Sequence, residues 1–478
     1  MGDREVFETA VRHAIRFREG VRDRPVGPTA TLPELRTALD VPLTDDGVDA
    51  AAVVDELARA AEGGLVANAG PRFFGFVIGG STPASVAADW LTSAWDQNSG
   101  LYAAGPAQAV VEEVSARWIV DLLGLPGSAS VGFVTGCQMA NFTALAAARN
   151  EVLRRAGWDV EEDGLQGAPP INVVAGEEVH VTIPRALRFL GLGQRRLIRV
   201  PADEQGRMRA DALRSVLGAL KGPTIVCAQA GNVNTGSFDP LEEIAGHCRA
   251  RDAWLHVDGA FGLWAAATPG RRDLLRGHHL ADSWATDGHK WLNVPYDSGL
   301  VICAHPAAHR AAMTAVAAYL IQGAPSALGV DEAARSSVGR DAVDWVPEFS
   351  RRARGFALYA GLRAMGRNGL SNLVERCCRH AALIADLLRS GPGVEVLNDV
   401  VLNQVLVRFT PPSGDADAFT RAVVARVQRE GVCWLSGSVW KGKAVMRISV
   451  SGEATTEADC RQSAASILAA ARGDPTKA

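Results

Sequence analysis

The sequence predicts an α/β protein. Three observations support this fold class: short runs that are apolar throughout, helical stretches between several of them, and a change of pattern near residue 355. The runs that are apolar throughout indicate strands buried on both faces of a sheet, and such sheets bind ligands near the carboxyl ends of their strands. The predicted strands are 130–135, 171–175, 196–200, 223–229, 253–258, 283–286 and 299–303, with helices at 138–156, 208–220 and 240–251.

The N-terminal segment has the pattern of a helical arm. Residues 3–20 and 47–62 place apolar side chains at helical spacing, which predicts amphipathic helices. The proline-rich stretch at 24–33 is predicted to be extended. Because this arm has little core of its own, we expect it to pack on another part of the assembly, such as a partner subunit.

The C-terminal segment predicts a small α+β domain. A long helix at 353–389 precedes two strand regions, 394–409 and 432–450. A helix at 415–430 separates these regions, and a last helix covers 456–472. The predicted division of the chain is therefore 1–85 for the helical dimerisation arm, 86–355 for the large domain and 356–478 for the small domain.

Composition excludes several classes of protein. The 478 residues are 47% hydrophobic and 21% charged, which is globular rather than disordered, collagenous or coiled-coil. The net charge of -4 gives no global basic surface for nucleic acid. Eight cysteines without a CxxC pair suit a reducing cytoplasm. The uncharged stretches 122–148 and 311–330 are interrupted by Gly, Pro and polar residues. They therefore predict a strand–turn–helix and a lid-like loop rather than membrane spans.

Only five of the 49 basic residues are lysines, a bias that genome composition explains. Among them, Lys290 follows an apolar strand and precedes Trp291 and Leu292. Such neighbours would desolvate the amine and lower its pKa, as a Schiff-base lysine requires. A lysine that extends its amine to the surface is the plain alternative.

Other candidate residues lie at the ends of predicted strands. Asp258 ends a buried strand, where a carboxylate is costly unless it is paired, for example with a pyridinium nitrogen or in a structural salt bridge. Gly136 opens a strand–helix turn whose helix N-terminus can bind phosphate. His180 could stack on a flat ring, form a hydrogen bond with a substrate carboxylate or be a structural residue, and His289 could donate to a phosphate.

Other motifs are absent from the sequence. It has no GxxxxGK[ST], no dinucleotide GxGxxG, no GxSxG and no HExxH. His278 and His279 have no further ligand at helical spacing, so no metal site is predicted.

In their order along the chain, these pieces resemble the group II pyridoxal 5'-phosphate (PLP)-dependent amino-acid decarboxylases, which include aromatic-L-amino-acid and glutamate decarboxylases. The matching segments are PRFFGFVIGG, VTGCQMAN, GEEVHVTI, QAGNVNTGSFDP, HVDGAFG, DGHKW and MRISV, within residues 60–460. The resemblance implies PLP fold type I, with a mostly parallel seven-stranded sheet in the large domain. It also implies a homodimer with shared active sites.

The resemblance also implies roles for individual residues. Lys290 forms the internal aldimine, Asp258 pairs with the pyridine nitrogen and His180 stacks on the ring. Tyr319, in a mobile loop, donates the proton to the substrate carbon across the dimer interface. The remaining positions bind the cofactor (Gly136, Cys137, Gln138, Asn232, Ala260 and His289) or the substrate (Phe76, Val77, Ile78, Arg447 and, from the other subunit, Leu101).

The implied reaction is decarboxylation of an L-amino acid to the amine and CO2 through an external aldimine and a quinonoid. The four apolar pocket positions add no positive charge, which favours aromatic or bulky apolar substrates over glutamate. A carbon–carbon lyase or an aldehyde-forming oxidative deaminase of the same fold remains an alternative, as does a catalytically silent scaffold. The phosphate turn departs from the family pattern, with Gly-Cys-Gln where relatives often carry Ser or Thr.

Overall fold

The computed structural model describes residues 3–314 and 339–473, which divide into two compact units. We call Gly79–Arg379 with Asn398–Gln404 the large unit. We call Met1–Ile78 with His380–Leu397 and Val405–Ala478 the small unit. The boundaries 85/86 and 355/356 drawn from the sequence stay predictions.

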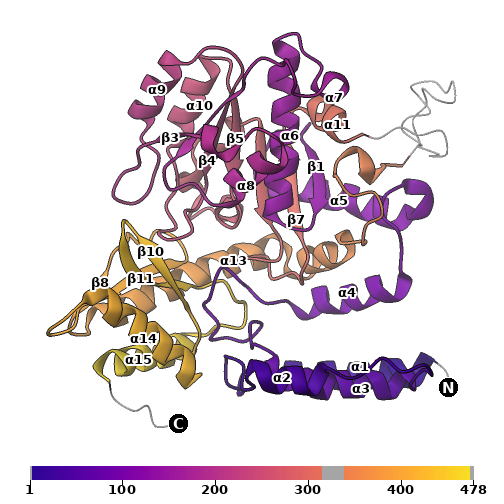
Figure 1. Ribbon diagram of the computed structural model, residues 1–478, viewed down its shortest axis with the longest axis vertical. Helices are drawn as coiled ribbons and strands as arrows, with labels where there is room; N and C mark the ends of the chain where they lie inside the picture. Colours follow the sequence, from indigo (N-terminus) through magenta and orange to yellow (C-terminus); the bar gives the residue numbers. More distant parts are fainter. Residues whose placement is uncertain (1–2, 315–338, 474–478) are drawn as a thin grey trace. The chain divides into compact units, whose positions relative to one another are not determined.

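The large unit contains a seven-stranded sheet in the order β1-β7-β6-β5-β4-β2-β3 (Figure 1). Only β7 runs antiparallel to its neighbours; the other pairs are parallel. This confirms the predicted mostly parallel sheet. The strands are β1 (Ser130–Val134), β2 (Asn172–Gly176), β3 (Ile198–Val200), β4 (Thr224–Gln229), β5 (Trp254–Asp258), β6 (Ser283–Asp287) and β7 (Gly299–Cys303).

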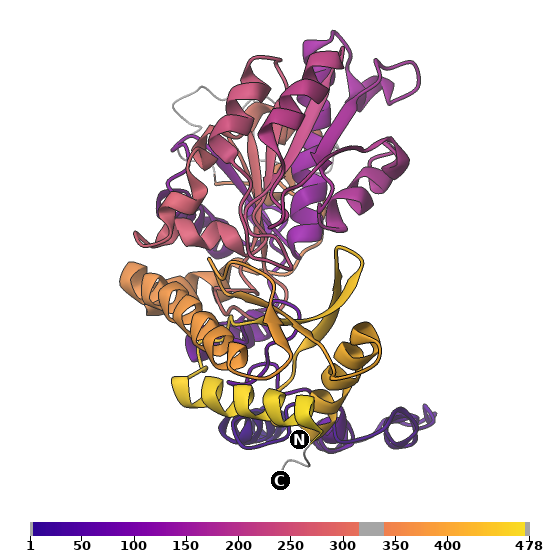
Figure 2. The same ribbon diagram turned by 90° about the vertical axis from the view of Figure 1, so that its left-hand side faces the viewer.

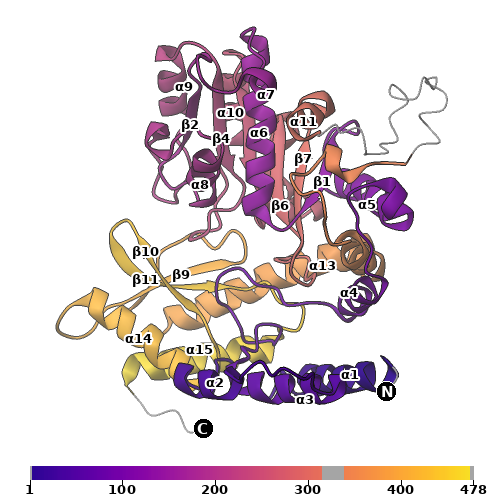
Figure 3. The ribbon, with the colours of Figure 1, turned by 45° about the vertical axis from the view of Figure 1, so that its right-hand side comes forward.

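Helix α6 (Cys137–Arg155) crosses one face of this sheet against β6 and β7 (Figure 3). Its buried face carries Ala140, Ala144 and Ala148 four residues apart, and these small side chains let the helix lie close to the strands. The helix begins three residues after the last residue of β1, so its N-terminus lies at the carboxyl end of that strand. Because β1 and β6 both pair antiparallel with β7, their carboxyl ends share this edge of the sheet.

The other helices of the large unit lie before, between or after the strands of this sheet in the chain. They are α4 (Pro83–Trp95), η2 (Tyr102–Ala104), α5 (Pro106–Leu122), α7 (Val160–Asp163), α8 (Thr182–Phe189), η3 (Gln194–Arg196), α9 (Ala210–Ala219), α10 (Leu241–Arg249), η4 (Gly262–Ala267), η5 (Arg272–Leu275), η6 (His278–Leu280), α11 (Pro306–Met313) and η8 (Ala342–Asp344). The residues of α13 (Gly355–Arg389) divide between the two units. Gly366, with φ +61°, interrupts the single long helix that the sequence predicts.

The small unit contains a four-stranded sheet in the order β10-β11-β9-β8. Helix α14 packs on β11 and on α15 (Figure 2), while α3 packs on α1 and α2. The strands are β8 (Val394–Val396), β9 (Gln404–Phe409), β10 (Ser436–Trp440) and β11 (Lys443–Ser449). The helices are α1 (Asp3–Gly20), α2 (Leu32–Leu39), α3 (Ala50–Ala61), η1 (Glu62–Gly64), α14 (Ala416–Glu430) and α15 (Glu457–Arg472).

The extended conformation predicted for 24–33 is wrong at its end, where α2 begins at Leu32. Thr31 caps the helix by accepting a hydrogen bond from the Glu34 backbone, and the Glu34 side chain accepts one from Thr31 N. Pro33 stands in the first turn, where the missing N–H costs nothing. The proline that suggested a break in fact marks a helix start.

The two uncharged stretches have different outcomes. Within 122–148, β1 and the beginning of α6 form the predicted strand–turn–helix. The stretch 311–330 lies outside the described residues from position 315 onward. Among the helices that the structure describes, none is long and apolar enough to cross a membrane.

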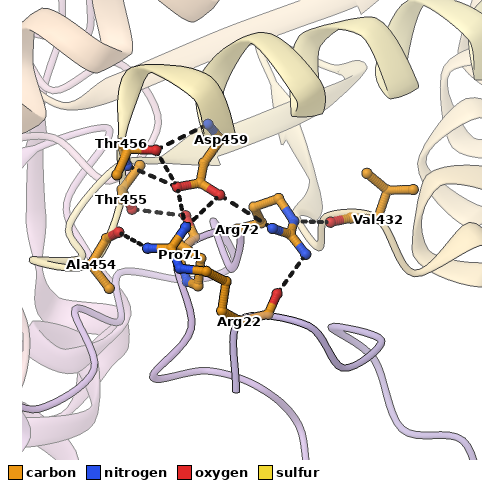
Figure 4. Close-up of polar contacts among 8 residues, drawn as sticks. All are labelled: Arg22, Pro71, Arg72, Val432, Ala454, Thr455, Thr456 and Asp459. Carbon is orange, nitrogen blue, oxygen red and sulfur yellow. Dashed lines mark hydrogen bonds and ion pairs between the residues drawn. The ribbon is translucent and has the colours of Figure 1, made fainter. Parts of the chain in front are cut away.

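A buried carboxylate fastens the N-terminal segment of the small unit to α15 (Figure 4). Arg22 and Arg72 donate to Asp459 at 3.1 and 3.2 Å, and the Thr456 hydroxyl donates to it at 2.6 Å. Arg72 also donates to the carbonyls of Val432 and Arg22. Burial alone raises the pKa of Asp459, but hydrogen bonds from Thr456 and Arg22 outweigh it and hold the pKa below its ordinary value. The ionised carboxylate therefore stabilises this unit.

Replacing Asp459 should make the small unit less stable. We expect Asp459→Ala to lower the free energy of unfolding by about 3 kcal/mol, because it leaves two guanidinium groups without their carboxylate. Glu457→Ala is the matched control on the same helix, since its pair with Arg461 is exposed and should cost less than about 0.5 kcal/mol. Urea denaturation measures both.

Because its folded-state pKa is lowered, Asp459 stabilises the fold above the pKa of the unfolded chain. The difference between wild type and Asp459→Ala should therefore shrink as the pH falls through the folded-state pKa. Equal effects of Asp459→Ala and Glu457→Ala at neutral pH would contradict this account.

Candidate active site

Two buried carboxylates end adjacent strands at the same edge of the large unit's sheet. Asp258 is the last residue of β5, and Asp287 is the last residue of β6, which pairs parallel with β5. Their exposed fractions are 5% and 1%. A buried carboxylate is stable only where donors or positive charges surround it, and both have such partners.

The partners of Asp258 come from three elements. Asn141 on α6 donates to Asp258 Oδ2 at 3.1 Å, and Thr182 on α8 donates to the same oxygen at 3.4 Å. The other oxygen, Oδ1, accepts from the Ala260 backbone at 3.2 Å and from the Cys137 thiol at 3.5 Å. Burial, together with the charges of Asp258 and Asp287, raises the pKa of the Cys137 thiol well above its ordinary value. Cys137 is therefore a neutral donor.

Lys290 forms an ion pair with Asp287, with 2.8 Å between Nζ and Oδ2. Burial by itself lowers the pKa of Lys290, as the apolar neighbours in the sequence suggested. The negative charge of Asp287 and its hydrogen bond outweigh burial, so the net effect is to raise the pKa above its ordinary value. The predicted lowering is therefore wrong for this structure, and Lys290 is an ammonium ion.

Asp287 is a site residue that sequence reasoning missed. Besides pairing with Lys290, it accepts a hydrogen bond of 2.6 Å from the backbone N–H of Cys137, at the N-terminus of α6. A carboxylate is favoured there because of the helix dipole and the free N–H groups. The signal was available: Asp287 ends a buried strand in TDGHK, just as Asp258 does in LHVDG.

The predicted phosphate turn is a tight backbone contact. A Cβ on Gly299 would lie 2.4 Å from Gly136 Cα, and a Cβ on Gly136 would lie 3.0 Å from His289 Cε1. The Ser298 N–H donates to His289 Nδ1 at 3.1 Å, so His289 carries its proton on Nε2. Nε2 lies 3.5 Å from Asp287 Oδ1. The turn and His289 thus belong to one cluster with Asp287.

His180 and Gln138 join this cluster through Thr182. His180 Nδ1 lies 2.9 Å from the Thr182 hydroxyl, and Gln138 Nε2 donates to the Thr182 carbonyl at 3.3 Å. The contacts therefore run without a break from Lys290 through Asp287, Cys137, Asp258 and Thr182 to His180.

Asn232 has a buried donor without a partner. Its Oδ1 accepts from the backbone N–H groups of Asn234 and Thr235 at 2.9 and 3.2 Å. Among the residues that the structure describes, no acceptor lies within hydrogen-bond distance of its Nδ2. A buried amide donor left this way is unfavourable unless a ligand supplies an acceptor. Ala230, two residues earlier, donates to the Asp258 carbonyl, which links this loop to β5.

The small unit carries a second group of predicted site residues. Phe76 has φ +54° and is 55% exposed, an unusual conformation for an aromatic residue. Trp434 stacks on Phe76 at 5.6 Å and on Phe73 at 5.0 Å, and a Cβ on Gly75 would lie 2.1 Å from the Trp434 ring. Arg447 donates to the Phe76 carbonyl at 3.3 Å. Trp434 therefore stabilises the segment from Phe73 to Phe76 by packing against it.

The structure says less about the four remaining positions predicted to bind substrate or donate a proton. Val77 is buried and Ile78 half-buried beside Phe76 in the small unit. Leu101 is half-buried and immediately precedes η2. Tyr319 lies outside the described residues, and its role stays a prediction.

Residues 33–410 match the family model of the pyridoxal-dependent decarboxylase conserved domain. The chain belongs to this family. It is a PLP-dependent amino-acid decarboxylase, a carboxy-lyase, as the sequence predicted. Aromatic-L-amino-acid decarboxylase of Bacillus atrophaeus is 27% identical over 95% of this chain and 92% of its own. Human acidic amino acid decarboxylase is 28% identical over 80% of this chain and 71% of its own.

Solved structures agree on the fold of this decarboxylase. Rice TDC with PLP and tryptamine has a TM-score of 0.89 and 23% identity, covering 98% of this chain and 97% of that one. Mouse CSAD has a TM-score of 0.84 and 24% identity, covering 97% and 96%. At this identity the likeness establishes the fold, PLP fold type I, and leaves the substrate open.

The described residues of this decarboxylase fit its cofactor. The Asn232 amide offers a donor for an acceptor oxygen, and the positive end of the α6 dipole beside Gly136 suits a phosphate. Lys290 offers an amine beside them. A buried carboxylate, Asp258, suits a positively charged ring nitrogen.

Removing the charge of Asp287 should free the amine of Lys290. In cofactor-free protein we expect Asp287→Asn to lower the pKa of Lys290, since burial then acts with less opposition. Each unit of lowering raises the fraction of neutral amine at pH 8 about tenfold. The rate of labelling by an amine-reactive reagent, followed by peptide mapping, measures this fraction.

Asp211→Asn is the control, because Asp211 pairs with Arg209 on the surface of the same unit. It should leave the labelling rate at Lys290 unchanged. If Lys290 is labelled at the same rate in Asp287→Asn and in wild type, Asp287 does not keep the Lys290 amine protonated.

Proposed function

We propose that this decarboxylase acts on an aromatic or bulky apolar L-amino acid and releases the amine and CO2. The observation that carries the proposal is the exposed Phe76 ring, held in place by Trp434 and followed by apolar Val77. The Bacillus atrophaeus aromatic-L-amino-acid decarboxylase aligns with 95% of this chain, whereas the human acidic amino acid and cysteine sulfinic acid decarboxylases align with 80%. The exposed aromatic ring supports an apolar side chain over an acidic one.

In this proposal the chain holds the cofactor through the cluster described above. Lys290 would hold it covalently, and Asp258 would pair with the ring nitrogen. His180 would stack on the ring, and Asn232 would donate to an oxygen on it. The positions that hold the phosphate are Gly136, Cys137, Gln138 and His289, with Ala260 beside Asp258.

Pyridoxal phosphate, when bound, supplies a ring that accepts the electron pair left by departing CO2. The residues of the chain control charge and protons around it. Asp258 accepts two hydrogen bonds on each oxygen, which fix the carboxylate that this proposal pairs with the ring nitrogen. Arg447, buried in the small unit, meets the substrate carboxylate. Tyr319 would deliver the proton to the substrate carbon, and Lys290 would supply the amine that holds the cofactor.

We also propose a homodimer in the cytoplasm. Helix α1 exposes Phe7, Val11 and Ile15 four residues apart, and α4 exposes Trp90, Leu91 and Trp95. Apolar stripes of this kind are usual where a second subunit packs. The eight cysteines are all free and buried, which suits a reducing compartment.

A substrate panel tests the proposed activity. The purified holoenzyme is incubated with aromatic, branched, acidic and basic L-amino acids, while CO2, amine, aldehyde and hydrogen peroxide are measured. We expect amine and CO2 in equal amounts, with aromatic or bulky apolar substrates ahead of glutamate. Borohydride reduction and peptide mapping should place the cofactor on Lys290. Aldehyde with peroxide instead of amine would favour the oxidative deaminase, and release of an aldehyde without CO2 would favour the carbon–carbon lyase.

Tyr319→Phe tests the proton donor. Loss of a positioned general acid typically costs about 100-fold or more in rate, so amine formation should fall by that order while aldehyde rises. Tyr359→Phe is the control, because Tyr359 stacks on Trp118 in the large unit. If the ratio of amine to aldehyde is the same in Tyr319→Phe and wild type, Tyr319 is not the donor.

A further inference from the structure

A chain of hydrogen bonds leads through the core of the large unit to Asp258. Its central member, His256, lies on β5 two residues before Asp258 and is completely buried. His256 Nε2 lies 2.9 Å from Asn141 Oδ1, and Asn141 Nδ2 donates to Asp258 Oδ2. On the other side, His256 Nδ1 lies 3.0 Å from Ser283 Oγ, which accepts from Trp254 Nε1 at 2.9 Å.

The direction of every bond in this chain is determined. An indole N–H can only donate, so Ser283 Oγ accepts from Trp254 and is able to donate its own hydrogen to His256 Nδ1. The Asn141 amide gives its NH2 to the carboxylate, so its carbonyl oxygen must accept from His256. His256 therefore carries its proton on Nε2, and all the donors point toward Asp258.

His256 is neutral in this position. Burial lowers its pKa to about 4, although the charge of Asp258 acts in the opposite direction. A neutral imidazole with one donor and one acceptor matches the Asn141 and Ser283 side chains on either side of it. It leaves the negative charge of Asp258 for the cofactor rather than neutralising it.

We infer that His256 is a positioning residue that fixes the Asn141 amide and, through it, the carboxylate of Asp258. An amide can turn over and exchange its oxygen and nitrogen. Turned over, Asn141 would place its oxygen against the Asp258 carboxylate and its NH2 against the His256 N–H, and both contacts would be repulsive. His256 thus selects the orientation that holds Asp258. This inference rests on the proposed pairing of Asp258 with the cofactor's ring nitrogen.

The test compares His256→Phe with His309→Phe. His309 is also completely buried in the large unit and also contacts two polar partners, Ser130 and the Trp345 carbonyl. Ser130 begins β1, at the opposite end of that strand from Gly136. Both variants should lower the melting temperature, because each loses two buried hydrogen bonds. Only His256→Phe should raise the dissociation constant for pyridoxal phosphate, by tenfold or more. Only this variant should also shift the pH midpoint of the bound cofactor's visible absorbance.

His256→Gln keeps a side-chain N–H donor and should restore part of the affinity and of the midpoint. Should His256→Phe fail to fold, Asn141→Leu breaks the same link and should show the same two changes. Equal dissociation constants and midpoints in His256→Phe, or in Asn141→Leu, and His309→Phe would overturn the inference.

Asp258→Asn separates this inference from the proposed function. If Asp258→Asn alters the affinity and the midpoint while His256→Phe alters neither, only the role of His256 is wrong. If Asp258→Asn alters neither, the proposed role of Asp258 is wrong, and the inference about His256 fails with it.

Discussion

Two carboxylates buried beside one amine are the constraint on which the large unit depends. Asp258 and Asp287 end neighbouring strands, and neither could remain ionised without donors brought by other elements. Helix α6 supplies the Cys137 N–H and the Asn141 amide, and α8 supplies Thr182. Lys290, three residues after Asp287, completes the set. The sheet order, the alanine face of α6 and the contact between Gly136 and Gly299 all bring these groups together.

The same constraint appears in the small unit. Asp459 is buried at the start of α15, and two arginines that lie 50 residues apart in the chain converge on it. Arg72 precedes the segment that leads to Phe76, whose unusual backbone is held by Trp434 and Arg447. A buried carboxylate in one unit thus orders a segment that presents an exposed aromatic ring.

Family and side chains decide different parts of the function. Membership in the pyridoxal-dependent decarboxylases establishes the cofactor and the class of reaction. The relatives include enzymes named for aromatic, acidic and cysteine sulfinic acid substrates, so membership does not choose the substrate. That choice depends on the side chains around the reacting carbon. We propose the apolar class because apolar side chains precede Gly79.

The sequence by itself determined the α/β class, the seven strands and the positions of Lys290 and Asp258, because buried strands are continuously apolar and a polar residue at their end stands out. It also determined the family, because several motifs occur in the expected order. It missed α2, whose first turn contains a proline, and the break at Gly366.

Only the tertiary structure decided the charge state of Lys290. Its neighbours in the chain predict a lowered pKa, whereas Asp287 raises it, since electrostatic energy depends on distance in space. The path from Trp254 to Asp258 likewise passes through Ser283 and Asn141, which lie far from β5 in the chain. Their hydrogen bonds exist only after the strands and α6 have packed, which is why no local pattern could reveal them.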